Sequence, residues 1–233
     1  MILFIGNLLS KQGLNPTAIE DLIKTLSQKY VVECASNKNN LVLRLLDMLA
    51  RVIVCRNKCK LVVLDVFSTR AILFAISIVS LAKFFKIPYY LVLRGGYLPE
   101  RYEKQPYIFN FLFSSAKKII SPSKYLQKSF EKTNFSIMVI PNYIDLKKYN
   151  FINRREIKPH LFWVRSIHAI YNPIMAINVL IEIRKKYPKA CLCIVGPVKD
   201  IEVMEHLNSM IHKFSLNNNI TFAGQLSKSE WSA

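Results

Sequence analysis

Short apolar runs alternate with helical patterns along almost the whole chain, and this alternation constrains the fold more than any other feature. Runs rich in Val, Ile and Leu, such as LVVLDV, lack in/out alternation, which is typical of strands covered on both faces. Regular β-α alternation of such strands predicts a doubly wound parallel α/β sheet. The first expected strands are 2–5, 31–34, 61–66, 89–93, 117–120 and 136–140, and the helices between them are 17–29, 41–54, 69–86, 107–115 and 123–133.

The β-α rhythm breaks over residues 141–159, which are rich in polar residues and prolines and read as a linker region. It resumes with strands expected at 160–165, 190–195 and 219–223 and helices at 173–186 and 200–214. We therefore expect an N-terminal domain over 1–150, a linker over 151–159 and a C-terminal domain over 160–233. The second domain has three expected strands, and a last helix begins near Ser227, so we expect it to be incomplete.

All six glycines lie in or beside turns that follow strand-like runs: Gly6, Gly13, Gly95, Gly96, Gly196 and Gly224. Glycine lets backbone N–H groups approach a ligand, and a helix that begins just afterwards adds a partial positive charge. In open α/β sheets the ligand crevice lies at the carboxyl ends of the strands. The glycines therefore predict a phosphate-bearing ligand, held in a cleft where two such edges face each other.

The chain carries a formal net charge of +18, and residues 1–150 hold 22 Lys/Arg against 9 Asp/Glu. Such an excess indicates anionic partners: a phosphorylated substrate, anionic lipid or nucleic acid. The cations are scattered, and no zinc-finger or RNP-type pattern accompanies them, so nucleic acid is not an expected partner. Scattered Lys beside Tyr and Phe fits a peripheral contact with an anionic membrane.

Two further features limit the function classes. The apolar run AILFAISIVSLA, residues 71–82, is too short for a bilayer and predicts a buried helix. The five cysteines form no pattern of a disulfide framework, and no secretory leader is visible, which favours a reducing cytoplasm. Cys55 and Cys59 lack His or a second Cys pair at zinc spacing, so no metal is expected.

Arg94 ends a strand and precedes a glycine pair in LVLRGGYLPE. Its planar guanidinium suits bidentate binding of phosphate or carboxylate. The alternative is a structural role, in which Arg94 pairs with Asp65 at the end of a neighbouring strand and holds the loop.

Arg165 ends an expected buried strand in LFWVRSIHAIYNP, and His168, Tyr171 and Asn172 follow in the loop. A buried, unpaired charge is costly, so we expect an anion or carboxylate to meet Arg165. The alternative is pairing with Glu182 or a backbone carbonyl. Asn172-Pro173 is expected to cap the next helix.

In order and spacing, these segments resemble the family 4 glycosyltransferases of the GT-B fold. The resemblance implies an N-terminal acceptor domain, a C-terminal domain that binds a nucleotide-sugar donor, and sugar transfer with retention and without a metal ion. It runs from residue 1 to 233 through the Gly6–Gly13 loop, LRGGYLPE, IISPSKYL, VIPNYIDLKKY, FWVRSIHAIYNP, CLCIVGP and ITFAGQLSKSE.

The resemblance assigns Arg165 to the donor diphosphate. His168, Tyr171 and Asn172, which follow it in the loop, are expected to bind the nucleotide sugar as well. It assigns the six glycines to three places: Gly6 and Gly13 near the donor phosphates and the acceptor, Gly95 and Gly96 beneath the transferred sugar, and Gly196 and Gly224 along the nucleotide side.

The chain departs from the family pattern at several positions. Arg94 stands where the family usually has a histidine that contacts the transferred sugar. Ile170, Tyr171 and Asn172 occupy the region of the usual Lys and Gly, and Tyr143 replaces the glycine of the common Pro-Asn-Gly. The two-glutamate motif that binds the donor is expected beyond residue 233.

The sequence thus predicts a cytoplasmic glycosyltransferase, at the inner face of the membrane, that moves a hexose or related sugar from a nucleotide donor to a glycan or lipid-linked acceptor. Arg165 and Arg94 are its expected catalytic residues. Three alternatives stay open: a nucleotide-sugar epimerase, a catalytically incomplete fragment, and a non-enzymatic basic module that binds anionic lipid or nucleic acid.

Overall fold

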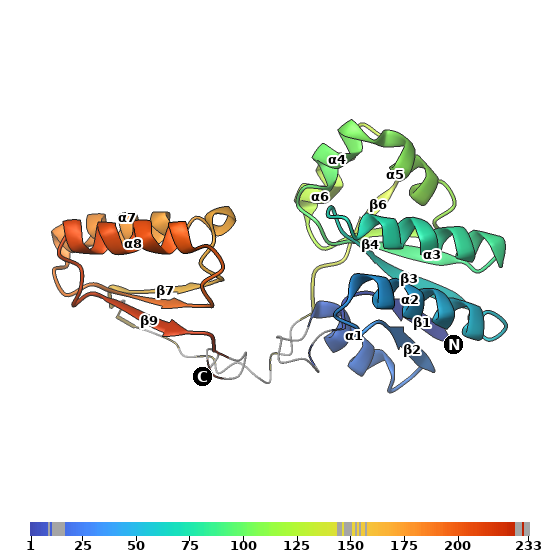
Figure 1. Ribbon diagram of the computed structural model, residues 1–233, viewed down its shortest axis with the longest axis horizontal. Coiled ribbons are helices and arrows are strands. Elements are labelled where there is room, and N and C mark those ends of the chain that lie inside the picture. Colours follow the sequence, from blue (N-terminus) through green and yellow to red (C-terminus); the bar gives the residue numbers. More distant parts are fainter. Residues whose placement is uncertain are drawn as a thin grey trace. The chain divides into compact units, whose positions relative to one another are not determined.

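The computed structural model describes residues 1–8, 10, 17–143, 146, 151, 153, 155–156, 158–226 and 230. Gly13 and Ser227 lie outside these residues, as do parts of the expected linker over 151–159. The chain divides into two compact units, Met1–Ile144 and Asp145–Ala233, and each is described by itself below (Figure 1).

The first unit is built on a six-stranded parallel sheet in the order β2-β1-β3-β4-β5-β6, which confirms the predicted fold class. Consecutive parallel strands need crossover helices, and the expected β-α rhythm supplies them. The strands are β1 (Ile2–Ile5), β2 (Val32–Ala35), β3 (Leu61–Val66), β4 (Tyr89–Leu93), β5 (Lys118–Ser121) and β6 (Ile137–Val139).

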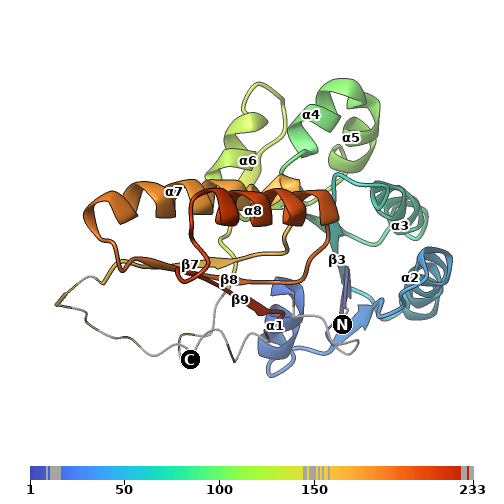
Figure 2. The ribbon, with the colours of Figure 1, turned by 60° about the vertical axis from the view of Figure 1, so that its left-hand side comes forward.

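Helices lie on both faces of this sheet, but unequally. One face packs against α2, α3, α5 and α6 in a large core, whereas α1 packs against Phe4, Val63 and Val92 on the other. Figure 2 shows α2 and α3 side by side and α1 apart from them. The helices are α1 (Ala18–Leu26), α2 (Leu41–Cys55), α3 (Ile72–Phe84), α4 (Leu98–Lys104), α5 (Pro106–Phe113) and α6 (Lys124–Ser129).

The α1 face of the sheet is less densely covered than the other face. Beyond α1 the strands leave a groove of about 290 Å³, lined by side chains such as Leu22, Val63 and Tyr90 and ending at Arg94. The reason is topological: among the described helices only α1 packs on this face, next to the edge strand β2.

The apolar run at 71–82 forms α3, and no helix of the described residues is long and apolar enough to cross a membrane. Ile72, Ala75, Ile78, Val79 and Ala82 are fully buried against the sheet and the neighbouring helices. The expected burial holds for that side of the helix only. The opposite side leaves large apolar side chains in solvent.

An aromatic cluster joins α4, α5 and α6 at one end of the first unit. The ring of Phe109 lies edge-on to those of Tyr102, at 5.6 Å, and Phe113, at 5.5 Å. Tyr102 belongs to α4, a helix that the sequence did not lead us to expect. Edge-to-face rings stabilise a core beyond the area they bury.

The second unit is a three-stranded parallel sheet in the order β7-β8-β9. Both of its long helices lie over the same face of the sheet (Figure 1), because the strands follow one another in order and both crossovers have the same hand. The elements are β7 (His160–Val164), a 3₁₀ helix η3 (Ala169–Tyr171), α7 (Pro173–Lys186), β8 (Cys191–Val195), α8 (Ile201–Lys213) and β9 (Ile220–Gly224).

A pair of substitutions on α5 tests the packing of the aromatic cluster. Phe109 is fully buried and Phe111 is 37% exposed, so the two positions differ in burial but not in residue type. Phe109→Leu should lower the free energy of unfolding by about 1–3 kcal/mol. Phe111→Leu should lower it by at most about 0.5–1 kcal/mol, because its ring contacts Lys83. Urea denaturation measures both, and equal effects would contradict the described core.

Candidate functional site

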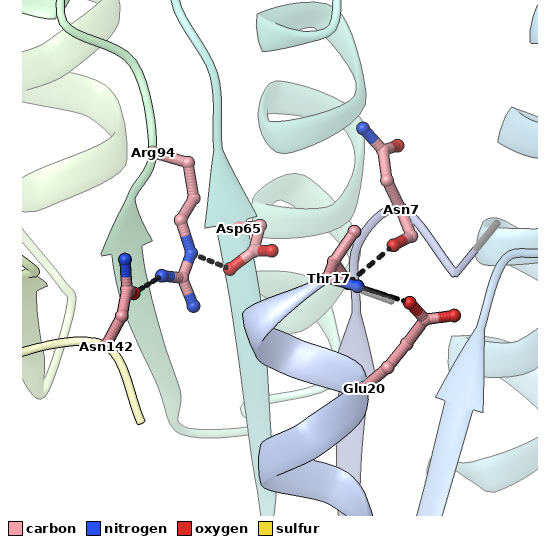
Figure 3. Close-up of polar contacts among 6 residues, drawn as sticks. All are labelled: Asn7, Thr17, Glu20, Asp65, Arg94 and Asn142. Atoms are coloured by element: carbon pink, nitrogen blue, oxygen red, sulfur yellow. Dashed lines mark hydrogen bonds and ion pairs between the residues drawn. The ribbon is translucent and has the colours of Figure 1, made fainter. Parts of the chain in front are cut away.

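The strand order of the first unit reverses at β1, which pairs with β2 on one side and with β3 on the other. Open α/β sheets bind ligands at the carboxyl ends of the strands at such a point. Figure 3 shows the polar residues gathered there: Asn7 after β1, Asp65 on β3, Arg94 after β4, and Thr17 and Glu20 at the start of α1.

The loop after β1 is tied to α1 by a capping box formed by Thr17 and Glu20. The Glu20 carboxylate accepts hydrogen bonds from Thr17 N–H at 2.6 Å and from Ser10 N–H at 3.1 Å, and Thr17 Oγ1 donates to Asn7 O at 3.1 Å. Burial acts to raise the pKa of Glu20, but these hydrogen bonds outweigh it and lower the pKa. Gly6 opens this loop, and its N–H donates to Ala35 O of β2 at 2.8 Å.

Arg44 is a residue of this edge that the sequence reasoning missed. It is 8% exposed on α2, in line with Met48, Val52 and Cys55. Its guanidinium donates to Lys38 O at 2.7 Å and to Asn7 Oδ1 at 3.3 Å. Arg44 therefore joins the loops after β1 and β2. The signal available in the sequence was the position of Arg44, which falls at helical spacing from the apolar residues on the buried side of the helix.

Arg94 takes the structural role that the sequence left open. Its Nε donates to Asp65 Oδ1 at 3.0 Å and its Nη1 to Asn142 Oδ1 at 2.5 Å. The Asp65 side chain is 4% exposed. Burial raises the pKa of the Asp65 carboxyl, and the charge and hydrogen bond of Arg94 oppose that rise. Asn142, a second residue that the sequence reasoning did not assign to the site, thus links the segment after β6 to this pair.

The glycine pair after β4 meets two different environments. A Cβ on Gly95 would lie 2.6 Å from Ser68 Oγ and 2.7 Å from Ser68 N, so the loops after β3 and β4 can touch only because it is absent. A Cβ on Gly96 would meet no atom within 4 Å. Arg101 of α4 adds to the same junction, since its Nη1 donates to Ser68 O and Thr69 O.

A polar pocket of about 410 Å³ opens at the carboxyl ends of β1 and β2. Glu20, Lys38, Asp47 and Arg51 contribute charges of both signs to its wall. Side chains of both signs with neighbouring amides and hydroxyls can bind a hydroxyl-rich molecule.

In the second unit the loops after β7 and β8 run in contact. Arg165 N–H donates to Val195 O at 2.9 Å, and a Cβ on Gly196, whose φ is +146°, would collide with the Arg165 carbonyl. Two bonds continue the pairing beyond the strands, from Ile167 N to Pro197 O at 2.9 Å and from Lys199 N to Ile167 O at 3.0 Å. Gly196 N–H also donates to Gly224 O at the end of β9.

The structure corrects the expected burial of Arg165. The residue is exposed, because β7 is itself only partly covered in this one-sided sheet. Glu182, the alternative partner, pairs with Lys185 at 2.7 Å instead. Within the described part of the chain, the Arg165 guanidinium has no ion-pair partner and lies 5.3 Å from the centre of the Tyr171 ring.

The loop that follows Arg165 is set by short-range hydrogen bonds. His168 Nδ1 accepts from Ile170 N–H at 3.1 Å, which leaves the Nε2 side of the ring to carry the proton. Asn172 has a left-handed φ of 50°, and its Oδ1 accepts from Met175 N–H at 3.3 Å, which confirms the predicted cap of α7. Asp200 caps α8 in the same way through Val203 N–H.

Both long helices of this unit therefore begin at the edge that carries Arg165. Their N-termini add partial positive charge there, and the exposed Lys199, which the sequence reasoning missed, adds a full one. The edge is suited to bind an anion such as a phosphate. Across the described residues, no group of three or more His, Cys, Asp or Glu side chains could hold a metal ion.

The structure thus groups the predicted site residues by unit. Gly6, Arg94, Gly95 and Gly96 lie at the carboxyl edge of the first sheet, and Gly13 lies outside the described residues. The second sheet carries the rest at its own carboxyl edge: Arg165, His168, Tyr171, Asn172, Gly196 and Gly224.

Two Rossmann-like units, each with a parallel sheet, give the chain a fold of the GT-B type. No family model and no curated protein matches the sequence. Solved structures do match, with identities that show the fold alone. HepE of Anabaena, solved with UDP and glucose, is 16% identical over 97% of this chain and 69% of its own, with a TM-score of 0.67.

Two further structures share the fold. The pneumococcal O-GlcNAc transferase GtfA, solved with UDP and GlcNAc, is 16% identical over 72% of this chain and 34% of its own, with a TM-score of 0.52. The UDP-GlcNAc 2-epimerase of Methanocaldococcus jannaschii is 12% identical over 99% of this chain and 74% of its own, with a TM-score of 0.55.

The adjacent glycines Gly95 and Gly96 allow a matched test of the first edge. Gly95→Ala should lower the free energy of unfolding by about 1–3 kcal/mol, because its methyl group meets the Ser68 backbone. Gly96→Ala should be neutral or stabilise by up to about 1 kcal/mol through the unfolded state. Thermal unfolding distinguishes them, and an equally stable Gly95→Ala variant would show that the loops do not touch.

The Asp65–Arg94 pair yields a pH-dependent expectation. Arg94→Met leaves Asp65 buried without its cation and should cost about 3–5 kcal/mol at neutral pH. The pKa of Asp65 then rises further, so the folded state keeps a proton that the unfolded chain releases above about pH 4. The deficit relative to wild type should therefore narrow as the pH falls.

Urea denaturation across a pH series measures this deficit. The control is the double variant Arg94→Met/Asp65→Asn, which has no carboxyl at position 65 to titrate, so its deficit relative to wild type should not narrow as the pH falls. A deficit of Arg94→Met that stays constant with pH would mean that Asp65 is not the group left unpaired.

Proposed function

We propose that the protein is a glycosyltransferase that uses a nucleoside-diphosphate sugar as donor, and that the carboxyl edge of the second sheet binds the donor diphosphate. One observation carries the proposal: the Arg165 guanidinium is exposed at the edge where α7 and α8 begin, and it has no carboxylate partner in the described part of the chain. The fold adds support, since HepE and GtfA share it and were solved with UDP.

Each group at this edge has a part in the proposed chemistry. When the sugar leaves, negative charge grows on the diphosphate, and fixed cations and amides stabilise it. The planar guanidinium of Arg165 binds the diphosphate, and the ring of Tyr171 packs against this guanidinium. Lys199 adds a second cation, and His168 Nε2–H is placed as a hydrogen-bond donor. Gly196 and Gly224 carry no side chain, so the backbone beside these groups leaves room for the ligand.

We assign the acceptor to the first unit, as the family resemblance implies. The pocket at the ends of β1 and β2 has room for a sugar residue, and its charged and amide groups match sugar hydroxyls. The acceptor would be a glycan or the sugar end of a lipid-linked acceptor. In this proposal Arg94 and Arg44 act as positioning residues for the two loops, and the sugar is transferred with retention and without a metal ion.

A nucleotide-sugar epimerase is the second candidate, because the M. jannaschii UDP-GlcNAc 2-epimerase shares the fold over 99% of this chain. The two candidates differ in what they need. An epimerase changes the donor sugar with no acceptor present, whereas a transferase leaves the sugar unchanged and releases the nucleotide when an acceptor is added. Analysis of the products formed from UDP-sugars separates them.

Titration calorimetry with UDP tests the proposed donor site. We expect saturable binding, and Arg165→Ala should weaken it by about tenfold or more, because a charge-assisted contact is lost. In a transfer assay the same variant should lower turnover by roughly 10²–10³-fold. The control is Lys185→Ala, which removes a cation of α7 that pairs with Glu182 and should leave binding unchanged.

Two results would reject the proposal. Equal affinities of the Arg165→Ala and wild-type proteins for UDP, or a turnover loss below about threefold, would exclude the role of Arg165. Affinity for DNA that rises with its length and falls steeply with salt, in place of saturable UDP binding, would instead indicate a basic binding module.

A further inference from the structure

The helix α2 is apolar on the side that faces solvent as well as on the side that faces the sheet. Its buried side consists of Arg44, Met48, Val52 and Cys55. A surface helix normally carries charged and polar residues opposite its buried stripe. On α2 the outward side chains are instead large and apolar, with exposed fractions from 41% to 75%: Val42, Leu43, Leu46, Ile53 and Val54.

The neighbouring helices continue this surface. Figures 1 and 2 both show α3 beside α2, and α5 also packs against α3. Leu73 and Phe84 are exposed on the outward side of α3, at 58% and 76%, and Tyr107 and Phe111 on α5. We call these nine side chains of α2, α3 and α5 the outer helix face. Ser77 and Ser80 lie between Leu73 and Phe84 on the same side of α3. Exposed apolar side chains gathered on adjacent helices mark an interaction site.

The charges around the outer helix face are mostly positive. Residues 41–113, which span α2, α3 and α5, contain eleven Lys or Arg and four acidic residues: Asp47, Asp65, Glu100 and Glu103. Asp65 is buried and paired with Arg94. Two of the cations are held against aromatic rings, Arg56 over Phe85 and Lys83 over Phe111, at 5.8 and 4.0 Å. The partner of this surface must therefore be apolar at its centre and negatively charged around it.

The cations also gather at one end of the helices. The helices α2 and α3 follow parallel strands, so both end at the amino edge of the sheet, opposite the carboxyl edge that holds Asp65 and Arg94. Around these two C-terminal ends lie five basic residues: Arg56, Lys58, Lys60, Lys83 and Lys86. Occupation of this surface would leave the carboxyl edge of the first sheet open to substrates.

We propose that the outer helix face docks on an anionic lipid bilayer. The apolar side chains of α2 and α3 enter the boundary between headgroups and acyl chains, and the basic residues bind the anionic headgroups. Long Lys and Arg side chains at the rim of an apolar surface can reach the headgroup layer while their stems stay on that surface. The proposal does not depend on the nucleotide-sugar function.

Vesicle co-sedimentation of the whole protein tests the proposal. We expect binding to vesicles of equal parts phosphatidylcholine and phosphatidylglycerol, and little binding to phosphatidylcholine alone. Leu46→Glu/Val54→Glu should weaken the binding by about tenfold or more, because both side chains leave the apolar boundary. Lys58→Gln/Lys86→Gln should weaken it by roughly 30-fold, about fivefold for each charge near the surface.

The control is Val179→Glu, a change at a comparably exposed apolar position on α7 of the second unit. It should bind vesicles like wild type. Urea denaturation of every variant checks that the first unit stays folded, and UDP titration checks the proposed donor site of the second unit. Loss of vesicle binding can therefore be separated from unfolding and from failure of the proposed function.

Three outcomes would overturn the proposal. One is equal binding to neutral and anionic vesicles, and another is vesicle binding that survives Leu46→Glu/Val54→Glu. The third is a stable dimer in light scattering that becomes a monomer in Leu46→Glu/Val54→Glu, because a second copy of the chain would then cover the face.

Discussion

The close contact between loops at the carboxyl ends of the strands is the constraint on which the candidate site depends. In the first unit the contact is ionic, since Arg94 binds the buried carboxylate of Asp65 and reaches on to Asn142. In the second it is a backbone contact that only glycine permits at position 196. The ionic contact and the backbone contact each fix the position of a loop, and the functional side chains belong to those loops.

The two edges use their arginines in opposite ways. The Arg94 guanidinium binds both Asp65 and Asn142, and the Asp65 carboxylate is buried. The charge of Arg94 is therefore largely neutralised within the protein. Arg165 has the same residue type at the same place in the β-α rhythm, yet it is exposed and contacts only an aromatic ring among the described residues. An anionic ligand gains more from the free cation, which is why the donor phosphate is assigned to the second unit.

Much of the fold could be predicted because the information is local. Continuous Val/Ile/Leu runs located the strands, and Asn172-Pro173 marked the start of α7, whose expected range of 173–186 matches the observed one. The helix α4 was missed because LPERYEK follows two glycines, although Pro99 near its start and Glu100 in its first turn are ordinary helix features. The exposure of Arg165 and the role of Arg44 depend on which helices cover which strand. No local sequence pattern contains this information.

The same limit explains why the outer helix face could not be located from the sequence. In α3 the apolar residues surround the helix, so periodicity does not tell which side meets the sheet, and only the packing shows that Leu73 and Phe84 are left outside. The basic residues are likewise distributed unequally between two parts of the protein. Few cations stand at the edge suited to phosphate, while many surround the ends of α2 and α3. In the bilayer proposal, the five cations at these helix ends serve an extended anionic partner and not a substrate site.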